Sequence, residues 1–514
     1  MHHPLAINLF IEIIGRMKTV VKINPEDEYQ KAKVILETSG KVLLDTPSLH
    51  ALDSTIENLF TVARVLMERE DKRRGKKKII PKENKSKKGR KEGEQRKETK
   101  KLPSERYPDL EIKENTILPP QIPTCPCCGL EMKESGLFDT TEKLEVVPKK
   151  YHIQRHKRPK YNCGKCHGAI INTAALPSIL PVSNYGDSMI IDATLSKFCD
   201  LIPMERYAQM AYRSGLMDLP AQSLIGLTHH LADFLYPIYN KIKKEVLLGE
   251  MLLADETTHK MLEGDETPNW YLWGFFNMRA SYFEAHGTRS GDVALEFLKE
   301  SQAKYLMTDG YSGYNKAVKL MEKKHARKIL LAGCNAHAIR YFKDASDPWK
   351  DECGPFLKLY GEIYELEDRV KSEGLDADEK FKLREKMIPI FENLKLRCEE
   401  ELSKAMVGSS FAKALKYFLN QYNELILCTK NLVIPLDNNH SEREVRPSVV
   451  GRKTWYGTHS KRGAQTLQIH FSIIGSCKVN NINPRRYYPW IVERILKSKE
   501  VLTPFEYSMF GEIQ

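Results

Sequence analysis

The chain has 514 residues, of which 41% are apolar and 29% charged. At about 150 residues per domain, this length suggests roughly three or four domains and a sizeable buried core. The composition excludes a wholly disordered chain, a collagen-like repeat and an integral membrane protein. It therefore indicates a soluble globular protein.

The N-terminal region reads as helical over residues 25–71, where Leu52, Ile56 and Leu59 share one face. A packed helix is favoured over a dimerisation helix, because the apolar repeat covers fewer than about four heptads. The preceding apolar run is interrupted by Asn8 and Glu12 and lacks the basic start of an export signal. We therefore expect a protein of the reducing cytoplasm.

The net charge of +12 is concentrated in one segment. Residues 72–101 contain sixteen Lys or Arg and four Glu, an excess that equals the net charge of the whole chain. Ile79 and Ile80 are its only large apolar side chains, so it cannot bury enough surface to fold alone. We predict a basic tether, whose cations would also bind a polyanion such as DNA by releasing counterions.

Five of the eleven cysteines lie within 42 residues, and such clustering favours a metal site over disulfides. Cys125 and Cys128 form one C-x-x-C pair, and Cys163 and Cys166 form a second, with 34 residues between the pairs. These four thiolates predict a closed, structural zinc site, with Cys127 as a spare. Three histidines rank below them as alternative ligands: His152, His156 and His167.

Cations crowd the loop between the two cysteine pairs, where Tyr151 and Ile153 alternate with polar residues. Cations beside aromatic side chains suit contact with nucleic acid, and a plain solvated loop is an equally good interpretation. The candidate DNA-binding residues are Lys149, Lys150, Arg155, Lys157, Arg158 and Lys160.

Residues 188–247 again have a helical pattern. One helix is predicted to end near Ser214, Gly215 supplies a turn position, and a second helix starts after Leu219 with Pro220 in its first turn. This outline matches a helix-turn-helix. Generic helical hairpins share it, so the outline alone favours the generic hairpin.

From Glu250 the pattern changes to short strands and helices. The order strand, strand, strand, helix, strand, helix, strand predicts a mixed α/β sheet. Residues 339–430 then carry long, charged helical patterns, and the turn PLDNN leads into another helix.

Three carboxylates occupy positions that suit catalysis. Asp255 is predicted to end the strand EMLLAD, Asp309 ends AKYLMTD, and Glu442 begins the helix after DNNHS. If the first and fourth strands are neighbours, as in a ribonuclease-H-like order, the two aspartates converge and Glu442 completes an oxygen cage for two Mg²⁺ ions. Such a cage suits phosphodiester chemistry. Taken singly, each acid has an ordinary alternative role: a turn cap for Asp255 or Asp309, and a pair with Arg446 for Glu442.

Cations surround the third acid, and a carboxylate site would otherwise repel DNA. Those that we assign to DNA binding are Arg443, Arg446, Arg452 and Lys453.

Five separated blocks resemble the signature of DDE transposases of the insertion sequence 66 family. They are ADET at Asp255, MTDGYSGYN at Asp309, CNAHAIRYF at Cys334, PLDNNHSEREVRPSVVGRKTWYG around Glu442, and the cysteine segment from CPCCG to CGKC. The resemblance covers residues 120–495.

The resemblance implies a ribonuclease-H-like catalytic core with a helical insertion, in which Asp255, Asp309 and Glu442 form the catalytic triad. It implies cleavage and strand transfer of insertion-sequence ends with two Mg²⁺ or Mn²⁺ ions, and a structural zinc. Its expected partners are terminal inverted repeats, target DNA, further copies of the chain and small accessory proteins, at the bacterial nucleoid and not at a membrane. Two alternatives remain: a zinc-dependent DNA-binding protein without catalysis, or an unrelated ribonuclease-H-like nuclease.

The chain departs from the family pattern at the Cys334 block, with Asn335 where Trp is usual and Ile339 where a basic residue is usual. The role of His337 is therefore open between orienting a phosphate or water and being a core histidine, which we favour. Residues 1–45 match nothing in the family pattern.

The predicted division of the chain has six parts. They are 1–71, helical; 72–119, basic tether; 120–177, zinc-binding module; 178–249, helical with a possible helix-turn-helix; 250–470, catalytic domain with its insertion at about 339–430; and 471–514, helical.

Overall fold

The computed structural model describes residues 102–108, 110–116, 122–131, 141–146, 149–162, 170–262, 269–372 and 374–509. The predicted N-terminal helical region and the basic run 72–101 lie outside them. The chain divides into two compact units. One contains Lys304–His440, and the other combines the residues from 81 to 303 with those from Ser441 onward. The predicted domain boundaries stay predictions.

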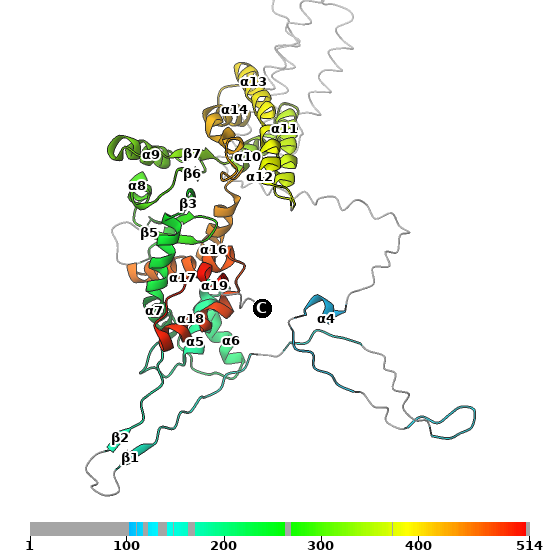
Figure 1. Cartoon of the computed structure of the whole chain (residues 1–514), viewed down its shortest axis with the longest axis vertical. Coiled ribbons are helices and arrows are strands. Elements are labelled where there is room, and N and C mark those ends of the chain that lie inside the picture. Colours follow the sequence, from blue (N-terminus) through cyan, green and yellow to red (C-terminus); the bar gives the residue numbers. More distant parts are fainter. Residues whose placement is uncertain are drawn as a thin grey trace, which may run out of the picture. The chain divides into compact units, whose positions relative to one another are not determined.

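The strands of the described residues form two sheets, and the larger one is mixed (Figure 1). The smaller sheet pairs β1 (Lys160–Asn162) with β2 (Ile170–Asn172) in antiparallel fashion. The larger has the order β5-β4-β3-β6-β7. Its strands are β3 (Met251–Lys260), β4 (Asn269–Phe276), β5 (Ser281–His286), β6 (Tyr305–Thr308) and β7 (Leu330–Gly333). β3, β4 and β5 pair antiparallel, whereas β6 and β7 are parallel. The predicted strand and helix order is confirmed.

The unit containing β3, β4 and β5 also contains β1, β2 and a set of helices. Its helices are α4 (Pro103–Arg106), α5 (Asp187–Phe198), α6 (Met204–Arg213), α7 (Ala221–Leu247), α8 (Gly291–Glu300), α17 (Lys461–Val479), α18 (Pro484–Ser498) and α19 (Pro504–Ser508), and α16 (Asn439–Trp455) enters it from the other unit. Among the described helices, none is both long and apolar enough to cross a bilayer. Between α6 and α7, Gly215 has φ +89°, and Pro220 is the N-cap of α7, one position before the predicted place.

Helix α17 covers the outer edge of strand β5. An edge strand presents backbone N–H groups that need partners. The amides of Ser281 and Phe283 donate to the Ser476 and Ser472 hydroxyls at 3.0 and 2.9 Å. Ala285 donates in the same way to Gln468, so side chains spaced four residues apart on α17 close this edge.

The unit Lys304–His440 joins β6 and β7 to a group of helices. They are α9 (Ser312–His325), α10 (Asn335–Ala345), α11 (Lys350–Val370), α12 (Ala377–Glu385), α13 (Ile388–Lys404), α14 (Ser410–Asn420), α15 (Tyr422–Leu425) and the 3₁₀ helix η2 (Ile426–Thr429). Helices α10, α11, α13 and α14 pack together (Figure 1). Their core contains aromatic side chains, including the stacked Phe342 and Phe356.

The buried Arg384 joins helices α11 and α12 to the chain around and after η2. The Arg384 guanidinium contacts both carboxylate oxygens of Glu367, at 2.9 and 3.0 Å. It also donates to the carbonyl oxygens of Cys428 and Ile434, at 2.6 and 2.7 Å. Charged hydrogen bonds of this kind fix geometry more than they stabilise the fold.

His470 of α17 is fully buried, and this sets a pH dependence of folding. Its Nδ1 lies 3.1 Å from the Tyr488 hydroxyl, and its Nε2 lies 3.2 Å from the Thr228 carbonyl oxygen. The ring stacks on Phe198. Burial lowers the pKa of His470 from 6.5 to about 4.

We therefore predict that stability falls on acidification, because the unfolded chain binds a proton at this position below pH 6.5 and the folded chain does so only near pH 4. His470 should account for a loss of about 2 kcal/mol in the free energy of unfolding between pH 7 and pH 5. Denaturant titrations should show a shallower pH dependence in His470→Asn and an unaltered one in the exposed control His230→Asn. The same pH dependence of the free energy of unfolding in the wild type and both variants would contradict this role of His470.

Candidate functional site

Asp255 lies in the middle of strand β3. The prediction that it ends the strand is wrong, because β3 continues to Lys260. The continuation has a partner, since β4 pairs with every residue from Leu253 to Lys260. The half-buried Asp255 accepts a hydrogen bond through Oδ1 from the Glu256 amide, at 2.9 Å.

The next carboxylate, Glu256, points to the opposite face of the sheet, as strand alternation requires. Its side chain is 1% exposed and pairs with Arg289 at 2.6 Å. The two adjacent acids therefore have different tasks. Glu256 belongs to a salt bridge on one face of the sheet, and Asp255 lies on the other face.

Asp309 directly follows β6, as predicted. Its Oδ1 accepts the Tyr311 amide at 2.9 Å in an Asx-type turn, and Gly310 between them has φ +90°. Its carbonyl oxygen accepts the hydroxyl of Tyr417 on α14, at 3.1 Å. The helical insertion thus fixes the backbone at Asp309, a role of Tyr417 that no sequence pattern indicates.

Glu442 lies in the first turn of α16, which confirms its predicted place at the start of a helix. The Asn439 amide at this helix start donates to Oδ1 of Asp437, at 3.1 Å. Glu442 is half-buried. A helix N-terminus favours negative charge, so this position suits a carboxylate.

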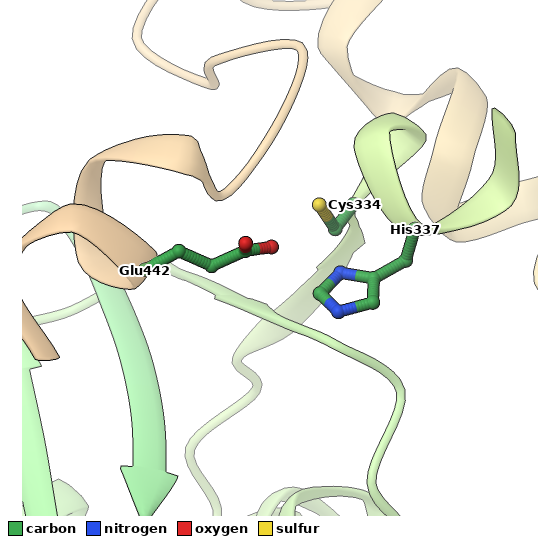
Figure 2. A group of neighbouring side chains, drawn as sticks. All are labelled: Cys334, His337 and Glu442. Atoms are coloured by element: carbon green, nitrogen blue, oxygen red, sulfur yellow. The ribbon is translucent and has the colours of Figure 1, made fainter. Parts of the chain in front are cut away.

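Cys334 and His337, shown with Glu442 in Figure 2, lie at the junction of β7 and α10. Each of the three side chains carries an atom that can coordinate a metal ion. Burial raises the pKa of the Cys334 thiol to about 11. His337 keeps part of its surface exposed, in contrast to the core residue His470.

The three acids belong to different units of the chain. Asp309 is part of Lys304–His440, whereas Asp255 and Glu442 are part of the other unit. Their convergence therefore stays a prediction.

Helix α16 carries a basic stripe next to Glu442. Arg443, Arg446 and Lys453 are exposed and share one side of the helix, whereas Val445 and Ser448 on the other side are buried. The spacing of three and ten residues produces this separation. We call these three cations the α16 stripe.

Arg452, the fourth predicted DNA contact on this helix, has a structural role. Its guanidinium donates to the Thr258 hydroxyl at 2.5 Å and so braces α16 against β3. The turn after α16 follows the same strand, since the Thr458 amide donates to the Lys260 carbonyl oxygen at 3.0 Å. A Cβ at Gly457 would lie 2.2 Å from that oxygen, which explains glycine in the motif WYG.

The cations that follow the first cysteine pair divide into two groups. Lys149 forms an ion pair with Asp192 and lies 3.3 Å from the Tyr207 hydroxyl, so protein contacts hold it. The other predicted DNA contacts of this segment are exposed: Lys150, Arg155, Lys157, Arg158 and Lys160.

The first cysteine pair lies in a tight turn that fits a zinc ligand. Gly129 has φ +73° and donates its amide to the Cys125 carbonyl oxygen at 2.9 Å. Hydrogen bonds from the amides of Cys127 and Cys128 lower the pKa of the Cys125 thiol. Amides that stabilise a thiolate suit metal coordination. Cys163 and Cys166 lie outside the described residues.

Comparison with known proteins gives two family matches. Residues 183–466 match the model described as the transposase IS66 family, and this range includes all three acids. Residues 123–167 match the zinc-finger binding domain of transposase IS66, which includes all four predicted zinc ligands.

The curated relatives come from Sinorhizobium fredii (strain NBRC 101917 / NGR234) and have no characterised activity in their names. The chain is 26% identical to "Uncharacterized protein y4hP" over 412 residues, which cover 76% of this chain and 73% of the relative. It is 27% identical to "Uncharacterized protein y4qI" over 394 residues, covering 74% and 72%. "Uncharacterized protein y4jD" is 24% identical over 409 residues, covering 76% and 78%.

We predict that Cys125→Ser lowers the zinc content of the purified chain from about one ion to well below one, because a closed structural site needs all four ligands. Elemental analysis measures this directly. Cys127→Ser is the matched control and should retain its zinc. Equal zinc content in both variants would remove Cys125 from the ligand set.

Proposed function

Because the chain belongs to the IS66 family of transposases, we propose that it is a DNA transposase that cuts and joins insertion-sequence ends through Asp255, Asp309 and Glu442. The observation that carries the proposal is the family match, which spans all three acids and more than half of the chain. The zinc-finger match adds support for a structural zinc in the N-terminal half.

The sheet order supports convergence of the two aspartates. Within the five-stranded sheet, β3 is the first strand along the chain and β6 is the fourth. These two strands are neighbours in the sheet order. Asp255 lies in β3 and Asp309 directly follows β6. This order agrees with the proposed ribonuclease-H-like core.

The path of the chain supports the proposed place of Glu442. Asn438 donates its amide to Cys334 Sγ at 3.2 Å, and Cys334 directly follows β7. Helix α16 begins at the next residue, Asn439. Glu442 follows Asn438 by four positions, and a helix rises only about 1.5 Å per residue.

The chemistry follows from this set of side chains. Carboxylate oxygens are the ligands that Mg²⁺ and Mn²⁺ prefer, so the three acids would hold two such ions. The ions would activate the attacking oxygen and stabilise the leaving one. Water would then cut a phosphodiester bond at the element end and free a 3′-hydroxyl. That hydroxyl would attack a phosphodiester bond of target DNA and displace a 3′-hydroxyl of the target strand, without a covalent intermediate on the protein. The three carboxylates would orient both steps and would not themselves be modified.

DNA binding follows from the cations around the site. The α16 stripe carries Arg443, Arg446 and Lys453 next to Glu442, where it would offset the repulsion between DNA phosphates and carboxylates. The exposed cations between Lys150 and Lys160 provide a second surface, beside the zinc-finger match. Arg452 and Lys149 contribute through the protein contacts described above. We further propose that the chain acts as a homo-oligomer, with small accessory proteins, at the bacterial nucleoid.

We predict that Asp255→Asn, Asp309→Asn and Glu442→Gln each lower metal-dependent nicking and strand transfer by about 100-fold or more, because residues that act as a unit fail together. The assay uses a supercoiled plasmid carrying the element ends, with Mg²⁺ or Mn²⁺.

Asp378, an exposed acid of α12, provides the control for this assay, and Asp378→Asn should retain activity. Wild-type activity in any of the three triad variants would remove that residue from the assignment. Cutting without joining by the wild-type chain would indicate a nuclease instead. Binding to element ends without any metal-dependent cutting would indicate a DNA-binding protein.

The α16 stripe generates a separate prediction for affinity. Replacing Arg443 and Arg446 by Ala should reduce the slope of log affinity against log salt concentration by about 0.9 for each phosphate contact removed. Fluorescence anisotropy with labelled duplex DNA between low and moderate salt measures this slope. The double control Lys382→Ala, Lys386→Ala removes two exposed cations at the end of α12 and should leave the slope unchanged.

A further inference from the structure

We propose that Asn335 is a positioning residue for the third carboxylate. Its side chain fastens the segment from Leu425 to Asn438, and this segment leads directly into the helix that carries Glu442. The proposal rests on the proposed function, since it assigns Asn335 a task within the same site.

The Asn335 side chain is fully buried, and both its amide nitrogen and its amide oxygen form hydrogen bonds. Its Nδ2 donates to the carbonyl oxygens of Leu425 and Leu436, at 3.1 and 3.0 Å. Its Oδ1 accepts the hydroxyl of Tyr360 at 3.4 Å. The Asn335 amide also donates to Leu436, at 3.3 Å. One residue therefore joins the start of α10 to both ends of the segment.

Cys334 adds a second attachment immediately before Asn335. Its sulfur accepts the Asn438 amide at 3.2 Å. Residues 334 and 335 thus hold positions 436 and 438 side by side.

The backbone between this attachment and Glu442 is also held by hydrogen bonds. Asp437 lies between the two held positions; its Oδ2 accepts the Tyr364 hydroxyl at 3.2 Å and its Oδ1 accepts the Asn439 amide at 3.1 Å. Helix α16 starts at Asn439, and its backbone hydrogen bonds fix the path to Glu442. A displacement at Leu436 therefore passes to the carboxylate.

A general structural role is the competing explanation, and Arg384 separates the two. Arg384 holds the same segment at Cys428 and Ile434, further along the chain from Glu442. Its loss should lower stability without displacing Leu436. Loss of Asn335 leaves the carbonyl groups of Leu425 and Leu436 without this donor and should displace the carboxylate.

The experiment compares Asn335→Leu and Asn335→Asp with Arg384→Met and Tyr360→Phe in the full-length chain. Asn335→Asp keeps the shape and loses both N–H donors, whereas Tyr360→Phe removes only the long hydrogen bond. Three quantities are measured at a temperature where circular dichroism shows each variant folded. They are the Mn²⁺ concentration for half-maximal nicking, Mn²⁺ affinity by calorimetry, and hydrogen exchange of peptides covering 430–445.

We expect both Asn335 variants to need about tenfold more Mn²⁺, as for loss of a residue that orients a metal ligand, and to show faster exchange around 436–442. Arg384→Met should lower the melting temperature and keep the wild-type Mn²⁺ requirement. Tyr360→Phe should resemble the wild type in all three measurements.

The outcomes separate the two proposals. If the wild-type chain nicks DNA and the Asn335 variants match it in Mn²⁺ requirement, affinity and exchange, the positioning role is wrong. If the wild-type chain shows no metal-dependent nicking, the proposed function is wrong, and the exchange of 436–442 still decides whether Asn335 fixes this segment. An equal rise in Mn²⁺ requirement in Arg384→Met would reduce Asn335 to a structural residue.

Discussion

Carboxylates that share one site repel each other, and each loses hydration as it becomes buried. Such a set persists only where the backbone beneath each acid is held by several independent contacts and where cations offset the charge. Asp255 meets this condition inside the paired ladder of β3 and β4. Asp309 meets it through its own turn and the Tyr417 hydroxyl. Glu442 meets it through the segment that Cys334 and Asn335 fasten.

The helical insertion therefore does more than separate the second acid from the third. Tyr417 on α14 reaches the backbone of Asp309, and Arg384 on α12 holds the return segment at Cys428 and Ile434. Both contacts come from helices of the insertion. The insertion thus holds the backbone of Asp309 directly, and it stabilises the return segment at positions 428 and 434.

Much of this fold follows from local patterns in the sequence. Alternating and continuous apolar runs gave the right order of strands and helices, and Asp309 and Glu442 lie where the pattern ends or begins. Asp255 does not end its strand, because pairing with β4 keeps the polar residues Thr257 and Thr258 in β3. The hydrogen bonds of Asn335 to Leu425 and Leu436, and of Tyr417 to Asp309, span 90 to 108 positions and follow no periodicity, so only the folded chain reveals them.

The central claim is that Asp255, Asp309 and Glu442 hold divalent ions together. Iron(II), which replaces Mg²⁺ at oxygen-ligand sites, cleaves the polypeptide near its binding position when ascorbate and peroxide are added. The account predicts three sets of fragments, with ends close to residues 255, 309 and 442, all suppressed by excess Mg²⁺. Cleavage near one acid alone, or a pattern insensitive to Mg²⁺, would contradict a shared site.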